Sequence, residues 1–140
     1  MKKSTKIFIA SLSVILVLFT FAFSKAQEDK THIKNTYESY ALVNEIISSE
    51  ENLEQAEGIL KVAEETFIED PNIYLQKARL YEKMKNYEEA EKNILKIFEM
   101  RPDLENNTDV LKLYANIVFL KGDHQKAQEI TNKLKELGGE

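Results

Sequence analysis

The chain has 140 residues, the length of one ordinary domain, and it carries a formal net charge of −5. It contains no cysteine, which excludes disulfides and thiolate metal sites, so a folded domain must be held together by packing alone. The acidic balance disfavours nucleic acid and anionic lipid as partners.

The first 26 residues form a segment of their own. A start rich in lysine is followed by an uncharged apolar run over residues 7–23 and by a small-residue pattern that ends at Ala26. This order predicts a secretory signal peptide over residues 1–26, cleaved after Ala26.

The same apolar run allows a second interpretation, a retained membrane anchor. It is long for the core of a signal peptide and short for a membrane span, which needs about 20 residues. In both cases the lysines stay on the cytoplasmic side and the rest of the chain is exported. We therefore expect a protein of the bacterial periplasm or cell envelope, or a secreted one, attached to the membrane through residues 7–23 if the leader is retained.

Residues 27–36 are polar and charged, and we interpret them as a short tether. From there to the end, the spacing of apolar residues is helical, and no stretch alternates with a period of two for long. Without its first 26 residues, which carry four lysines and no acidic residue, the chain has a net charge of −9.

Three segments of the helical region align around an alanine: residues 52–60, 86–95 and 123–131. Each begins with Asn or Asp, residues that favour the N-cap of a helix. The alanines at positions 56, 90 and 127 are spaced by 34 and 37 residues. A second helical run lies upstream of each segment, so the sequence repeats a pair of helices.

This pattern resembles the tetratricopeptide repeat, a helix–turn–helix unit of about 34 residues. The resemblance implies an all-α fold, a right-handed solenoid of antiparallel helix pairs, over residues 37–140. Its repeats would span about 37–70, 71–104 and 108–139. Positions that pack helices together in this family fall on Ala56, Tyr74, Ala78, Tyr81, Tyr87, Ala90, Pro102, Ala115 and Ala127.

The spacings also predict where the copies differ. The second helix of the first copy should run one turn further, because three more residues separate its alanine from the next proline. The third copy should carry its three extra residues, 105–107, in the loop before it. Ala90 should be small because two helices cross there, whereas Glu91 should point outward.

The last helix predicts the end of the stack. Its apolar residues form one stripe, Ala127, Ile130, Leu134 and Leu137, and its other face is polar. A helical stack needs such a polar cap.

Nothing in the sequence predicts chemistry. There is no Ser/His/Asp arrangement, no HExxH motif and no glycine loop for phosphate. Pairs of glutamates are adjacent in sequence, so on a helix they do not share a face. We predict no catalytic, cofactor-binding or metal-binding residues, and hence no enzyme; a small hydrolase is the least favoured alternative.

In the family, the first helices of successive repeats line a groove for partners. The resemblance carries this role to Leu75, Arg79, Lys83, Lys112, Asn116 and Phe119. Such a groove would hold a short peptide with an acidic and an apolar residue. In the competing interpretation, Phe119 and Leu120 are core residues and the basic side chains are merely solvated.

The function expected from these features is that of an exported, non-catalytic module that binds a peptide or protein segment. The alternative is a membrane-anchored scaffold or assembly subunit of an envelope complex.

Overall fold

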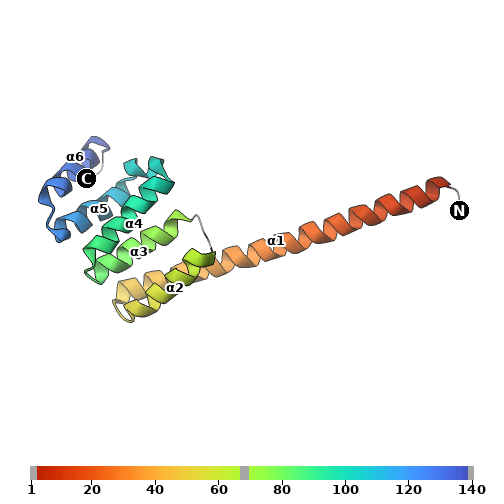
Figure 1. The fold of residues 1–140 in the computed structure, drawn as a ribbon, viewed down its shortest axis with the longest axis horizontal. Helices are drawn as coiled ribbons and strands as arrows, with labels where there is room; N and C mark the ends of the chain where they lie inside the picture. The colour runs from red at the N-terminus through yellow and green to blue at the C-terminus, as the bar shows by residue number, and fades with distance from the viewer. Residues whose placement is uncertain (1–2, 67–69, 139–140) are drawn as a thin grey trace. The chain divides into compact units, whose positions relative to one another are not determined.

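The computed structural model describes residues 3–66 and 70–138, with the backbone alone for residues 3–18, 21, 29, 31–33, 35 and 36. These residues form α1 (Lys3–Ser49), α2 (Leu53–Thr66), α3 (Pro71–Lys83), α4 (Tyr87–Met100), the 3-10 helix η1 (Pro102–Asn106), α5 (Thr108–Lys121) and α6 (His124–Glu136) (Figure 1). The described part of the chain contains no strand, and the predicted all-α class is confirmed.

The chain divides into two units, residues 1–38 and residues 39–140. The first unit is helical, and α1 continues through the predicted leader and the predicted tether into the second unit. Residues 27–36 are therefore helix. Within the residues that the structure describes, we find no helical stretch with the length and hydropathy that a membrane crossing requires.

The second unit is a stack of three helix hairpins. The end of α1 pairs with α2, α3 with α4, and α5 with α6, and each hairpin packs against the next (Figure 1). One core cluster joins Val43 of α1 and Leu60 of α2 to Leu80 of α3. A larger cluster runs from α3 to α6. This is the tetratricopeptide-like solenoid that the repeat pattern predicted; the handedness of the superhelix stays a prediction.

Small residues stand at buried positions on both helices of the middle hairpin. Ala78 of α3 and Ala90 of α4 are both fully buried in the larger cluster. A longer side chain at either position would force the two backbones apart. The packing explains why these positions are alanine in a helix otherwise rich in long side chains.

Polar side chains cap the helices. Asn86 and Asp123, predicted from the repeats, accept hydrogen bonds from the backbone N–H groups of Glu89 and Lys126, at 3.3 and 3.1 Å. Asn52 behaves differently: it has a left-handed backbone conformation (φ 56°), and its carbonyl oxygen accepts from the N–H of Gln55.

Two further caps fix the starts of α3 and α5. Asp70 accepts a hydrogen bond from the N–H of Asn72 at 2.9 Å, and its other carboxylate oxygen accepts from the Tyr40 hydroxyl of α1 at 2.6 Å. Asn107 accepts from two backbone N–H groups at the start of α5. Asp70 thus caps one hairpin and joins it to the preceding one.

The two predicted differences in length between the repeats have different outcomes. The connection between α4 and α5 does hold additional residues, which form η1 and the Asn107 cap. The predicted extra turn of α2 falls on residues 67–69, which lie outside the described residues.

The last helix buries a single stripe, Ala127, Ile130 and Leu134. Leu137, predicted to extend that stripe, follows the end of α6 and is 42% exposed, so that part of the prediction is wrong. The outward residues of α6 are polar, among them Gln125, Gln128, Glu129 and Asn132.

Candidate functional site

The six predicted partner-binding residues lie on two neighbouring first helices, a surface we call the first-helix face. Leu75, Arg79 and Lys83 belong to α3, and Lys112, Asn116 and Phe119 belong to α5. Leu75 is half-buried and packs against the larger core cluster. Lys112, Asn116 and Phe119 are exposed. The face therefore has exposed side chains on α5 and a half-buried apolar side chain, Leu75, on α3.

A hydrogen bond brings the two helices of this face together. The Asn116 side-chain amide donates to the Glu82 carboxylate, across 34 residues of sequence. Lys83 is also engaged, because its ammonium nitrogen lies 2.6 Å from a carboxylate oxygen of Glu50 beyond the end of α1. Two of the six predicted residues therefore already have partners inside the domain, and their polar groups are less available to a ligand.

Arg79 and Lys112 are the cations of the face that remain unpaired. Arg79 precedes Glu82 by three residues and Lys112 precedes Asn116 by four, so each lies about one helical turn before the bonded pair. Neither has an ion pair with any of the residues that the structure describes. The Glu82 carboxylate is about one turn away, but it is bonded to Asn116 and forms no ion pair with either cation.

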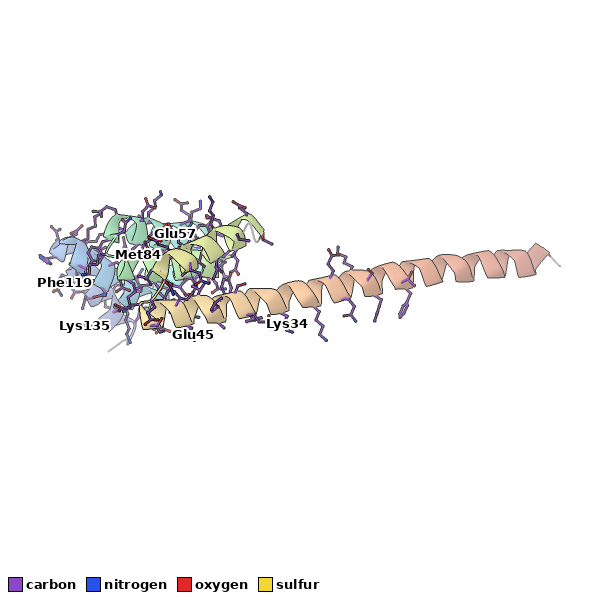
Figure 2. All side chains as sticks on the ribbon, turned by 90° about the horizontal axis from the view of Figure 1, so that it is seen from below. Lys34, Glu45, Glu57, Met84, Phe119 and Lys135 are labelled. Atoms are coloured by element: carbon purple, nitrogen blue, oxygen red, sulfur yellow. The ribbon has the colours of Figure 1, made fainter. Side chains whose placement is uncertain are left out.

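Phe119 and Leu120 are 56% and 45% exposed, so the interpretation that places both in the core is wrong. The Phe119 ring contacts the His124 ring, with 4.9 Å between the centroids. Figure 2 shows Phe119 at the outer end of the α5–α6 hairpin. The face therefore ends in an exposed aromatic pair, and His124, which sequence analysis had not assigned to the face, belongs to it.

The residues predicted to pack the repeats occupy a range of environments. Ala56, Ala78, Ala90 and Ala127 are buried, while Tyr74, Tyr81, Tyr87 and Ala115 are half-buried against the core. Pro102 is exposed at the start of η1.

Polar bonds reinforce the α2–α3 contact. Lys77 bonds Glu64 at 2.7 Å, and the Tyr81 hydroxyl donates to Glu57, the labelled α2 residue of Figure 2, at 2.8 Å. Burial, together with that carboxylate, raises the pKa of Tyr81 to about 12. Lys77 and Tyr81 thus join the second hairpin to the first.

Glu91 contradicts the sequence analysis. It was predicted to point outward from α4, but it is only 8% exposed. Its carboxylate lies between the ammonium groups of Lys121, at 2.8 Å, and Lys126, at 2.6 Å, and accepts a 3.3 Å hydrogen bond from the Tyr114 hydroxyl. No local sequence pattern predicts this arrangement, because the bonding partners follow Glu91 by 23 to 35 residues.

The surroundings of Glu91 favour its charged form. Burial alone would raise the pKa of this carboxyl, but the hydrogen bonds and positive charges of Lys121 and Lys126 outweigh burial and hold its pKa below the usual value. The ion pair in turn raises the pKa of both lysines. All three groups are therefore ionised around neutral pH.

Two hollows of the described surface are not lined by any of the six residues of the first-helix face. One of about 600 Å³ is lined by charged side chains of α4 together with Glu64, Tyr74 and Lys77. Another, of about 650 Å³, lies by the α1–α2 turn and Met84. Among the described residues, no group of three or more histidines, cysteines or carboxylates is arranged to hold a metal ion.

Comparison with known proteins agrees with this architecture. A family model described as "Tetratricopeptide repeat" matches residues 71–104, the α3–α4 hairpin with η1. Comparison with curated protein sequences found no significant match. The middle hairpin therefore contains a tetratricopeptide repeat, and a similar hairpin packs on each side of it.

Proposed function

We propose that the chain is an exported, non-catalytic module that binds a peptide or protein segment on its first-helix face. The tetratricopeptide repeat over residues 71–104 supports a role in protein–protein interaction. The sequence of the leader supports export. The observation that carries the choice of surface is the pair of unpaired cations, Arg79 and Lys112, beside the exposed Phe119.

The charges of the face favour an acidic ligand. The chain without its leader carries a net charge of −9, so two neighbouring cations without carboxylate partners are a local exception of sign. Such exceptions attract ligands of opposite charge and speed their association. Phe119 adds an apolar contact at one end of the face.

The spacing of these groups suggests a ligand motif. Lys112 and Phe119 are separated by seven residues of α5, which corresponds to about 10 Å along the helix. An extended peptide advances about 3.3 Å per residue, so its acidic and apolar residues would be separated by about three positions.

The test uses the full-length protein and labelled peptides in which one acidic residue and one phenylalanine are separated by one to six positions. We expect the tightest binding near a separation of three. Arg79→Glu combined with Lys112→Glu should weaken binding of that peptide by about tenfold or more and reduce its dependence on salt. Phe119→Ala should also weaken binding, with little change in melting temperature, because the ring is largely exposed.

A matched control is Lys61→Glu combined with Lys92→Glu, which makes the same change in net charge at exposed positions on α2 and α4. Equal loss of binding in both double variants would mean that only overall charge matters. Unchanged binding after the reversal of Arg79 and Lys112 would rule out the first-helix face.

Export is proposed from the order of residues 1–26. With cleavage after Ala26, the mature chain begins at Gln27, and the mass of the intact exported protein measures this directly. A full-length species in the membrane fraction would instead indicate a retained anchor and favour the role of envelope scaffold subunit.

A further inference from the structure

The carboxylate of Glu91 joins three helices at one point. Glu91 belongs to α4, Tyr114 and Lys121 to α5, and Lys126 to α6; we call these four residues the Glu91 cluster. Lys121 bonds one carboxylate oxygen, and Lys126 and Tyr114 bond the other. The Lys126 ammonium group also lies over the Tyr114 ring, 5.2 Å from its centroid. The four side chains of the cluster therefore contact one another.

The two lysines stand on opposite sides of the α5–α6 turn. Lys121 is the last residue of α5 and Lys126 lies in the first turn of α6. Between them, Gly122 has a left-handed conformation (φ 98°) and Asp123 caps α6. By bonding both lysines, Glu91 ties this turn to the middle hairpin.

The remaining contacts between the middle and last hairpins are mainly aliphatic or aromatic. Apolar contacts are non-directional, and they tolerate small shifts of one helix along another. Charge-assisted hydrogen bonds are short and directional, so they select one position. Besides the Asn116–Glu82 hydrogen bond between α3 and α5, the cluster supplies the directional contacts of this interface, and it alone ties α4 to the α5–α6 turn among the bonds of the described residues.

Stability alone does not account for an ion pair whose carboxylate is buried, even though the Lys121 and Lys126 side chains are partly exposed. Desolvation of the charges opposes their attraction, and well-packed apolar replacements are often as stable or more stable. The desolvation of Glu91 at an interface that is mainly apolar suggests that the charges determine position.

We propose that the Glu91 cluster fixes the position of the α5–α6 hairpin on α4. Lys112, Asn116 and Phe119 lie on α5, so the same cluster fixes their distance from Arg79 on α3. Glu91 is then a positioning residue for the first-helix face, although it lies on a second helix. Only this consequence for the face rests on the proposed function.

The test measures position without any ligand. The chain has no cysteine, so Lys61→Cys on α2 and Gln128→Cys on α6 provide clean sites for two spin labels. Pulsed electron paramagnetic resonance spectroscopy then gives the distribution of distances between the two spin labels. The key variant replaces Glu91, Lys121 and Lys126 together by methionine, which keeps the side chains long and removes every charge.

We expect the triple methionine variant to melt at or above the wild-type temperature and yet to give a broader distance distribution. A distribution as narrow as that of the wild type would overturn the proposal. A large fall in melting temperature would do so too, because the charges would then serve stability. Glu99→Gln, which changes an exposed carboxylate of the same helix, is the control and should leave the distribution narrow.

Hydrogen exchange of Glu91→Gln gives a second measurement. Losing hydrogen bonds to a charged group should speed the exchange of α6 amides by about 10- to 100-fold while α2 amides change little. A uniform increase over all helices would indicate global destabilisation and contradict the proposal. Since no peptide is present, neither failure would bear on whether the first-helix face binds one.

Discussion

Ala90 has no exposed surface and lies on α4 in the core cluster that it shares with Ala78 of α3. Ala90→Leu should therefore overpack the crossing and lower the free energy of unfolding by about 1–3 kcal/mol. Denaturant titration of both proteins measures the difference.

The control for that substitution is Lys92→Leu, at an exposed position of the same helix. It adds the same residue without filling buried space, and exposed ion pairs such as the one between Lys92 and Glu89 contribute little. If the two leucine variants unfold at the same denaturant concentration, Ala90 is not the point of closest approach.

Glu91 makes stability depend on pH. Its pKa in the folded protein lies below the usual value, so its contribution is present above the unfolded-state pKa and is lost as the pH falls through the folded-state pKa. Glu91→Gln should cost about 1–2 kcal/mol at pH 7, and much less at roughly pH 2–3.

Urea midpoints of the wild type and the Gln variant at the two pH values check this sign. Glu99→Gln, at an exposed site, should cost little at either pH. A difference between wild type and Glu91→Gln that grows in acid would show that Glu91 is not held as the charged form.

Ala90 and Glu91, which are neighbours in the sequence, show which buried residues the sequence can predict. The buried alanine was predictable, because its burial follows from a spacing that recurs along the chain. The buried glutamate was not, because its partners belong to the next hairpin and a lone glutamate on a helix usually faces solvent.

At the scale of the helix, replacing glycine by alanine should have opposite effects on stability at two positions. Gly122 ends α5 with φ 98°, a conformation that strains any residue with a Cβ, so Gly122→Ala should cost about 1 kcal/mol. Gly58 lies inside α2, where an added Cβ meets nothing within 4 Å, so Gly58→Ala should stabilise by about 0.5–1 kcal/mol.

Thermal melts of the two single variants and of the double variant test the pair. The sites are in different hairpins, so the two effects should nearly cancel in the double variant. Stabilisation by Gly122→Ala would contradict the left-handed turn.

Helix starts were partly predictable. Asn86 and Asp123 recur in register with the repeated alanines, and both act as caps. Asp70 was overlooked although Pro71 follows it, and an N-cap residue before proline is a known start signal. Its bond to Tyr40 had no such signal, because it joins residues 30 positions apart.

At the scale of the molecule, the repeat spacing predicted the stack, whereas the structure of residues 27–36 did not follow from their composition. Polar composition indicates exposure to water, and an exposed segment can still be helical. Residues 1–49 contain neither glycine nor proline, so nothing in the sequence interrupts α1. The first-helix face was predicted residue by residue from the family, but which of its cations remain unpaired depends on contacts between hairpins.

The two core clusters lie entirely within residues 39–140. Deletion of residues 1–38 should therefore leave the melting temperature nearly unchanged. Deletion of α6 should abolish cooperative melting, because it uncovers apolar residues of α5 such as Val118. Circular dichroism and size-exclusion chromatography distinguish these outcomes, and a shorter chain without α6 that still melts cooperatively would contradict the expectation.

The polar outer side of α6 has a consequence for assembly. Hairpins of this kind add to one another through apolar faces, and contacts that join the end of one molecule to the start of the next do not close but grow into filaments. The outer face of α6 instead carries glutamines, an asparagine and a glutamate, so it offers little apolar surface for such a contact. With leucines in their place the outer face of α6 would be apolar, so these polar side chains oppose end-to-end association of the stack.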